Sequence, residues 1–510
     1  MKILDCTLRD GGYYTNWDFD SQCVQSYLVS LNKLPVDYIE IGYRSIPMQE
    51  YLGKYFYSPI YEIENLKKIT NKKLVVIINE KDIRKEHLKA LLEPIVGLVA
   101  MVRIALDPEN LVRAITLTEE IKKYGFEVAF NVMYMSKWKE KSGFLTQLNS
   151  VNGLADCFYM VDSYGGVTPT EVVETIGLLK DSINVPLGFH GHNNLELALI
   201  NTLTALENGV EMVDATILGM GRGAGNLKTE LLLTYLNKEK GFNVDFNALG
   251  QAVDAFQPLL NKHQWGTNLP YMISGANSLP QKNVMDWVTT RFYSFNSIIR
   301  ALDNRSNQRE DNDQFPPVHL KEESAVLLVG GGESVLEHQE AIKTFLKNRP
   351  EVVIIHASSK NAYLFKDLPN KQYFCLVGNE GHRLEKVFND LSGFNGQCIL
   401  PPYPRVMGTY VPASIKPNTF ELEHIDFTNR FKDAHTAIAL QVVLNMQAKD
   451  LFVVGYDGYS DMLVTQKERD LNIENSYLFE LIKDNENINL TSLTTSLYNF
   501  LPVTSIYSLI

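Results

Sequence analysis

Short apolar segments that recur through about the first 220 residues constrain the fold of this chain more than any other feature. Polar or helical-looking sequence separates them, and successive segments lie roughly 20 to 35 residues apart, as strands do when each is followed by a helix. Continuous apolar runs of this kind are typical of strands buried on both faces of a parallel sheet. The segments are residues 3–5, 38–41, 74–78, 98–104, 127–132, 157–161, 186–190 and 212–216. Eight β/α units predict a closed (β/α)8 barrel.

An open doubly wound sheet is the alternative to a barrel. Such a sheet would carry a Gly-rich dinucleotide fingerprint after its first strand, whereas this chain has Thr-Leu-Arg-Asp-Gly-Gly at residues 7–12. We therefore predict an α/β protein with an N-terminal TIM barrel. A barrel gathers its functional side chains at the C-terminal ends of the strands, and polar residues do follow several of the predicted strands.

The rest of the chain divides at a polar segment. Residues 231–302 have the amphipathic spacing of helices, so a helical annex or lid is predicted after a barrel of residues 1–230. Residues 303–322 include a polar run with almost nothing to bury and two prolines, and they are predicted to form a linker. Apolar segments then resume, and residues 323–510 are predicted to form a Rossmann-like α/β domain.

The composition argues against several classes of partner. The chain has 48 Lys and Arg against 60 Asp and Glu residues, a net charge of −12, and no long basic block, so nucleic-acid binding is not expected. No segment approaches the roughly 18 apolar residues of a membrane span, and no leader-like segment opens the chain. The five cysteines are scattered and form no C-x-x-C pair, as in proteins of a reducing compartment. We expect a soluble cytoplasmic protein without a membrane partner.

Two of the predicted strand ends carry groups that bind cations or anions. After the first strand, the Arg9 guanidinium can hold a carboxylate or an enolate and the Asp10 carboxylate can bind a hard cation. A simple ion pair between these two residues is equally consistent with the pattern. His190 and His192 end the seventh strand and point to the same side of it, because they are two residues apart. We interpret these histidines as ligands of one metal ion.

A Gly-rich loop, residues 219–226, follows the eighth strand and ends in Asn226. Its glycines let backbone N–H groups approach a ligand, so a phosphate loop is an equally valid interpretation of the loop alone. Together with Asp10, His190 and His192, Asn226 would complete a mixed nitrogen and oxygen site with open positions. Such a site suits Mn²⁺, Mg²⁺, Co²⁺ or Zn²⁺ as a Lewis acid.

These motifs resemble those of a known family. The segments TLRDG at 7–11, DSYGG at 162–166, HGHNN at 190–194 and GMGRGAGN at 219–226 follow the predicted strands in the order found in the DRE-TIM metallolyases, also called HMGL-like proteins. The resemblance covers about residues 3–230. Within the family the chain is most similar to the 4-hydroxy-2-oxovalerate aldolases and less similar to the isopropylmalate and homocitrate synthases.

The resemblance implies a role for each matching residue. The ligands of the divalent metal, for which Mn²⁺ is preferred, would be Asp10, His190, His192 and Asn226. Arg9 would stabilise the enolate of pyruvate, and Ser163 would help to hold the 2-oxo acid. Tyr271, in the annex, is a candidate lid residue, because the aldolases also use a tyrosine from outside the barrel; simple packing is the alternative. Homo-oligomers are common in the family and are expected here.

The proton-transfer group departs from the family pattern. The pyruvate aldolases have a histidine three residues after the metal-binding aspartate, and this chain has Tyr13 there. A tyrosine with its ordinary pKa of about 10 is a weak base at neutral pH, although a nearby cation lowers that value. We predict that Tyr13 acts with a bound water, or that Glu40 at the end of the second strand replaces it. The alternative for Glu40 is a salt bridge with Arg44 at the barrel mouth.

The second domain has two motifs of its own. Gly330, Gly331 and Gly332 follow an apolar strand, a pattern that fits either a phosphate-binding loop or a tight turn. Asp457 lies in a Gly-x-Asp-Gly segment after a later strand, as a ligand-binding carboxylate or as a turn residue. Residues 324–465 loosely resemble the 6-hydroxymethylpterin pyrophosphokinase-like proteins and their glycosyltransferase-associated relatives, which implies a nucleotide or sugar-nucleotide ligand.

The function predicted from these features is that of a divalent-metal-dependent pyruvate aldolase. It would form or cleave a 4-hydroxy-2-oxo acid through a metal-stabilised enolate, with an aldehyde partner less volatile than acetaldehyde. The second domain's resemblance places it in bacterial surface-sugar biosynthesis. Two alternatives stay open: an acyl-CoA-dependent Claisen-type enzyme on the same barrel, and a metal-binding scaffold that has lost catalysis.

Overall fold

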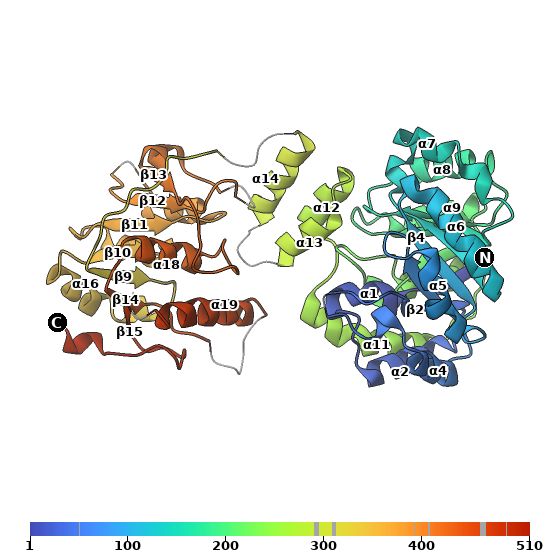
Figure 1. The fold of residues 1–510 in the computed structure, drawn as a ribbon, viewed down its shortest axis with the longest axis horizontal. Helices are drawn as coiled ribbons and strands as arrows, with labels where there is room; N and C mark the ends of the chain where they lie inside the picture. The colour runs from blue at the N-terminus through green and yellow to red at the C-terminus, as the bar shows by residue number, and fades with distance from the viewer. Residues whose placement is uncertain are drawn as a thin grey trace. The chain divides into compact units, whose positions relative to one another are not determined.

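The computed structural model describes residues 1–49, 51–289, 295–308, 313–391, 393–405, 409–459, 466–485 and 487–510. The chain divides into two compact units, Met1–Met285 and Asp286–Ile510. In Figure 1 the first unit is coloured blue to green and the second yellow-green to red.

The first unit is built on a closed barrel of eight parallel strands, paired in sequence order with β1 next to β8. The strands are β1 (Lys2–Asp5), β2 (Tyr38–Tyr43), β3 (Lys73–Asn79), β4 (Met101–Leu106), β5 (Glu127–Val132), β6 (Cys157–Asp162), β7 (Leu187–Gly191) and β8 (Met212–Ala215). The predicted eight-stranded barrel is confirmed. The largest difference is at β4, which begins three residues later than expected because Gly97, with φ of 80°, turns the chain before the strand.

Amphipathic helices surround the barrel and bury their apolar faces against the outward side chains of the strands. The sequence at the start of α8 (Pro169–Lys180) explains where this helix begins, because Thr168 and Glu171 form a capping box and Pro169 is the first helical residue. The helices are α1 (Thr7–Thr15), α2 (Ser21–Leu31), α3 (Lys54–Tyr57), α4 (Ile60–Ile69), α5 (Lys85–Leu92), α6 (Leu111–Ile121), α7 (Ser142–Leu145), α8 (Pro169–Lys180) and α9 (Ala198–Glu207).

Further helices follow the barrel strands. They are α10 (Thr229–Lys240), α11 (Phe246–His263), α12 (Leu269–Ala276) and α13 (Gln281–Thr289). The first three belong to the first unit, whereas α14 (Phe295–Ser306) belongs to the second. The predicted linker, 303–322, begins inside α14, and its residues 309–312 lie outside the described part of the chain.

The barrel interior changes character along its axis. One layer is mostly apolar and is formed by residues such as Leu4, Val75 and Met101. Towards the C-terminal ends of the strands the inward side chains become charged, and Glu40 and Arg103 are both fully buried there. Because buried charges need partners, this end of the barrel must hold a connected polar network.

The second unit is a seven-stranded parallel sheet in the order β13-β12-β11-β10-β9-β14-β15. Its strands are β9 (Ala325–Val329), β10 (Val353–His356), β11 (Gln372–Cys375), β12 (Gln397–Leu400), β13 (Thr419–Glu421), β14 (Asp450–Val454) and β15 (Asn489–Ser492). The helices are α15 (Ser334–Glu337), α16 (Gln339–Lys347), α17 (Glu380–Phe388), α18 (His435–Asn445) and α19 (Gln466–Lys483). The predicted second α/β domain is confirmed.

Both faces of this sheet are covered. Val326 and Leu328 of β9 pack with α18 and α19 on one face, while Leu327 and Val329 pack with α16 on the other. The strand order extends in one direction from β9 through β10 to β13, and then restarts on the other side of β9 with β14. Such a reversal opens a crevice at the carboxyl ends of the strands.

Among the described residues, neither unit has a helix with the length and apolar character that a membrane span requires.

The bulge in β2 generates a stability prediction. The register shifts between Glu40 and Gly42, and a Cβ on Gly42 would overlap the backbone carbonyl of Tyr55. Gly42→Ala should therefore destabilise the barrel unit by about 1 to 3 kcal/mol, measured by urea unfolding. Tryptophan fluorescence suits the measurement, because Trp17, Trp138 and Trp265 lie in that unit.

The matched control is Gly177→Ala. Gly177 lies inside α8, is exposed, and a Cβ there would meet nothing within 4 Å. This substitution should raise the free energy of unfolding of the barrel unit by about 0.5 to 1 kcal/mol. Equal effects of the two substitutions would contradict the close approach of α3 to the bulge.

Candidate functional site

Three potential metal ligands converge at the C-terminal end of the barrel. Asp10 lies in the first turn of α1, which begins almost directly after β1, and His190 and His192 come from the end of β7. One ligand atom from each of the three residues lies within 4.8 Å of the others, and all three side chains are buried. The structure thus brings together the carboxylate and the two imidazoles that the sequence predicted.

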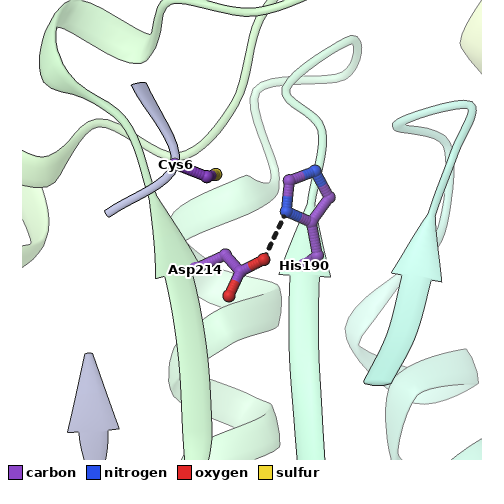
Figure 2. Close-up of side chains that lie close together, drawn as sticks. All are labelled: Cys6, His190 and Asp214. Atoms are coloured by element: carbon purple, nitrogen blue, oxygen red, sulfur yellow. Dashed lines mark hydrogen bonds and ion pairs between the residues drawn. The ribbon is translucent and has the colours of Figure 1, made fainter. Parts of the chain in front are cut away.

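Hydrogen bonds fix both imidazole rings. Nδ1 of His190 lies 2.8 Å from Oδ2 of Asp214, as Figure 2 shows, and Nδ1 of His192 lies 2.7 Å from the backbone oxygen of Asp162. Because each Nδ1 is engaged, Nε2 is the atom left for a ligand. Nε2 of His190 is 3.5 Å from Oδ2 of Asp10.

Asn226 lies beside Asp10. Its Nδ2 donates to Asp10 Oδ2 at 2.7 Å, while its Oδ1 is buried without a hydrogen-bond partner among the described residues. The glycines of the loop make this position accessible, since a Cβ on Gly221 would overlap the Asn226 amide and one on Gly225 would overlap the carbonyl of Gly219. A buried amide oxygen next to a carboxylate fits a cation.

A second potential metal site shares His190. Cys6, His190 and Asp214 also offer ligand atoms within 4.8 Å of one another, and Figure 2 shows the three side chains together. Asp214 already accepts from Arg103 Nη2 at 2.6 Å and contacts the imidazole at 2.8 Å. Both contacts use Oδ2, and Oδ1 of Asp214 is buried without a hydrogen bond among the described residues, so a cation held by this group would lie beside the positive charge of Arg103.

Beneath the site, a network of buried charges joins the strands. Arg103 is fully buried and contacts Asp214, Glu40 at 3.3 Å and the amide oxygen of Asn131 at 2.7 Å. Its guanidinium also lies over the ring of Tyr159, 4.1 Å from the centroid. Each of the three guanidinium nitrogens therefore has an acceptor, and the flat face of the cation contacts an aromatic ring.

Arg9 connects this network to the metal ligands. Its Nε lies 2.7 Å from Glu40 Oε2, and its Nη1 contacts Asp10. The ion pair between Arg9 and Asp10, one of the two interpretations of the motif, is thus present, and it lies inside the candidate site.

The alternative proposed for Glu40, a salt bridge with Arg44, is wrong. Arg44 lies past the bulge of β2 and donates to the backbone carbonyls of Leu91, Tyr57 and Ser58. Glu40 points inward instead, between two guanidinium groups, and its Oε1 is buried without a hydrogen bond in the described structure.

The electrostatic field of the site favours the forms that bind metal. Burial works against the ionised form of Asp10, but Arg9, His190 and His192 outweigh it and lower the pKa of the carboxyl group. Burial, aided by the neighbouring His190, lowers the pKa of His192 to about 3. At neutral pH the site therefore presents a carboxylate and a neutral imidazole.

Tyrosines line the mouth of the barrel. The hydroxyl of Tyr13 is 3.3 Å from that of Tyr43, and burial raises the pKa of Tyr43 well above its ordinary value. Tyr14 donates to the carbonyl of Gly223 at 3.1 Å. Tyr271 of α12 is buried next to Tyr14 and faces the same glycine, so the annex contacts the Gly-rich loop directly.

Ser163 lies in the loop after β6 and is almost fully buried. Its Oγ accepts a hydrogen bond from the backbone N–H of Tyr134 at 2.9 Å, which ties the loops after β5 and β6 together. Its predicted contact with the 2-oxo acid stays a prediction.

Comparison with known proteins places this site in a family. The HMGL-like family description matches residues 1–255. The chain belongs to the HMGL-like family. A 4-hydroxy-2-oxovalerate aldolase of Pelotomaculum thermopropionicum is 33% identical over 278 residues, which are 52% of this chain and 78% of the relative. The enzyme of the same name from Moorella thermoacetica is 31% identical over 292 residues, 54% of this chain and 82% of the relative.

One solved structure agrees with these relatives. The crystal structure of the N-terminal domain of a candidate aldolase from Bacteroides vulgatus is 60% identical, with a TM-score of 0.57. The match covers 59% of this chain and 100% of that domain. The N-terminal unit is therefore an HMGL-like domain of the aldolase type.

Several residues of this HMGL-like site were not singled out from the sequence. They are Arg103, Asn131, Asp214, Tyr43 and Arg222. A usable signal existed for the first three, because each is a polar residue inside an apolar strand at an inward-facing position. Arg222 lies inside the Gly-rich loop that the sequence singled out, but nothing in that motif assigned a role to its side chain. For Tyr43, the last residue of β2, the sequence offered no signal.

The charge network predicts a large cost for removing its central cation. Arg103→Met would leave Glu40 and Asp214 buried without their shared partner and should destabilise the barrel unit by about 3 to 5 kcal/mol in urea unfolding. Lys238→Met, where the side chain is 82% exposed, should change stability by no more than about 0.5 kcal/mol. A mild effect of Arg103→Met would show that the network is not what holds this end of the barrel together.

Proposed function

We propose that the N-terminal unit is a divalent-metal-dependent aldolase that uses pyruvate or another 2-oxo acid as donor and forms or cleaves a 4-hydroxy-2-oxo acid. The observation that carries this proposal is the convergence of Asp10, His190 and His192 around one point, with the open Oδ1 of Asn226 beside them. The names of the relatives that match the barrel support the same reaction class.

The metal is assigned to the group that contains Asp10. Both imidazoles of this group have Nδ1 engaged and Nε2 available, whereas a cation at Cys6 and Asp214 would lie beside the positive charge of Arg103, which repels it. The mixed nitrogen and oxygen donors suit Mn²⁺, our preferred metal, as well as Mg²⁺, Co²⁺ or Zn²⁺. When bound, such a cation would act as a Lewis acid that draws negative charge from a chelating 2-oxo acid.

The chain's own groups prepare the donor for reaction. Arg9 places a permanent positive charge beside Asp10, where it stabilises negative charge that develops on a substrate oxygen. Glu40 and Asp10 hold this guanidinium in place, so little reorganisation is needed when the charge develops. Ser163 is proposed to contact the 2-oxo acid from the loop after β6.

Proton transfer is assigned to the paired phenols of Tyr13 and Tyr43. Their hydroxyls are 3.3 Å apart, so one phenol can accept the proton of the substrate hydroxyl as it releases its own through the other to a bound water. Glu40 is less suited to this role, since Oε2 is already shared by two guanidinium groups. Tyr271 contributes to the wall of the site rather than to the chemistry.

Arg222 supports a proposal for the class of acceptor. Its guanidinium lies 5.3 Å from the centroid of the Tyr13 ring and close enough to His192 to lower the pKa of that imidazole. Among the described residues it has no carboxylate partner. A half-buried cation without a counter-ion at the mouth of the site fits an aldehyde that bears a carboxylate or phosphate group.

Exchange of the pyruvate methyl protons with deuterated solvent tests the donor assignment. With Mn²⁺ present, the wild type should exchange these protons, and His190→Ala and Asp10→Asn should each reduce the rate at least 100-fold together with the metal content. His424→Ala is the matched control, because that imidazole lies in the second unit and its side chain is 62% exposed. Exchange in wild type and His190→Ala at equal rates would refute the assignment.

The acceptor assignment is tested by kinetics of aldol formation with pyruvate. Arg222→Gln should raise the KM for succinate semialdehyde about 10- to 100-fold and leave that for neutral butanal unchanged, because only the former can pair with the guanidinium. Lys238→Gln, at the end of α10 where the side chain is 82% exposed, is the control. A rise in the KM for pyruvate alone would instead assign Arg222 to the donor.

A further inference from the structure

The second unit contains a cavity of about 630 Å³ at the carboxyl ends of its strands. The loops after β9, β10 and β14 line it, together with the start of α17 and α18. This is the point where the strand order reverses, the usual position of a ligand in a doubly wound sheet. A volume of this size accommodates a small organic ligand.

The glycine loop after β9 leaves room in this cavity. A Cβ on Gly330 would overlap the carbonyl of Gly455, so the two strand ends approach as closely as their backbones allow. A Cβ on Gly331 would lie 3.3 Å from Ser358 Oγ, on the side that faces the cavity. The N–H groups of Gly330 and Gly332 already donate to the carbonyls of Val454 and Gly455, so the backbone of Gly331 is the part of the loop that faces a ligand.

Asp457 also lines the cavity, but its carboxylate is already engaged. Both carboxylate oxygens accept from Ser334, Oδ2 from the backbone N–H at 3.0 Å and Oδ1 from the hydroxyl. This geometry supports the turn interpretation of the Gly-x-Asp-Gly segment. The charge that a ligand would meet comes from other residues.

A cationic cluster occupies one wall. Glu380 is buried; its Oε1 accepts from the backbone N–H and the hydroxyl of Ser359, and its Oε2 lies 3.2 Å from Arg383 Nη1 and 3.5 Å from His435 Nε2. Lys360 donates to the carbonyl of Gly331 at 3.1 Å and has no carboxylate partner among the described residues. One carboxylate on this wall thus faces two permanent cations and an imidazole. The cavity as a whole is also lined by Glu333, Asp457, Glu468 and Glu474.

The opposite wall is polar, and it includes the carboxylates of Glu468 and Glu474 from α19. Thr436 donates to Oδ1 of Asn475 at 2.9 Å, and Nδ2 of Asn475 donates to the hydroxyl of Tyr498 at 3.2 Å. Tyr456 completes this wall, with its hydroxyl 3.2 Å from that of Thr436. Hydroxyl, amide and aromatic groups in one network suit a sugar or another hydroxylated ring.

We propose that this cavity binds a phosphorylated small molecule of the nucleoside diphosphate type. Its phosphates contact Lys360, Arg383 and the backbone of the glycine loop, and its sugar contacts the wall of Thr436 and Asn475. Charge decides the orientation, because Lys360 and Arg383 lie on one wall, whereas the carboxylates of Glu468 and Glu474 lie on α19, where they suit the hydroxyl groups of a sugar.

Calorimetric titration of the full-length chain with uridine diphosphate and with inorganic pyrophosphate tests this proposal. Both probes should bind the wild type. Arg383→Gln and Lys360→Gln should each lower the affinity for both probes at least tenfold, because each substitution removes a charged hydrogen bond to phosphate. Lys366→Gln is the control, since this exposed lysine follows the same segment but does not line the cavity.

Thr436→Val separates the two walls. It should weaken the affinity for uridine diphosphate about five-fold and leave the affinity for pyrophosphate unchanged, because only the nucleotide reaches the wall of Thr436. Thermal melting of each variant establishes that it is folded. Absence of binding by both probes at millimolar concentration, or binding that the Arg383 and Lys360 substitutions leave unchanged, would overturn the proposal.

Discussion

The buried guanidinium of Arg103 is the interaction on which the rest of the barrel's functional end depends. It neutralises Glu40 and Asp214 in the barrel interior, and these two carboxylates in turn hold Arg9 and the imidazole of His190. The candidate metal ligands are therefore positioned from below by the core of the barrel. Such a network is costly to bury unless every member is paired, which explains why so many strands contribute to it.

The sequence predicted the parts of this structure that depend on local pattern. Apolar runs predicted the eight barrel strands, and alternation along β7 predicted that His190 and His192 would face one point. The pairing of charges could not be predicted in the same way. Arg44 was the near neighbour of Glu40 in sequence, yet the true partners come from β4 and α1, because closing the barrel brings distant residues together.

Both units place their candidate sites at the carboxyl ends of parallel strands, but the two sites suit different ligands. In each unit the carboxyl ends of the parallel strands lie at one edge of the sheet, and the loops that follow the strands place polar side chains there. In the barrel those side chains are a carboxylate and two imidazoles, which suit a divalent cation. In the second unit the cavity wall carries Lys360 and Arg383, which suit an anion. The chemistry of each site therefore follows from the residues at its strand ends and not from the fold.

The most direct test of the central claim is anomalous diffraction from crystals of the full chain grown with Mn²⁺. The account predicts one strong manganese peak in the barrel, within bonding distance of an Asp10 carboxylate oxygen and of Nε2 of His190 and His192, with Asn226 Oδ1 adjacent. A peak between Cys6 and Asp214 instead, or no ordered peak in the barrel, would contradict it.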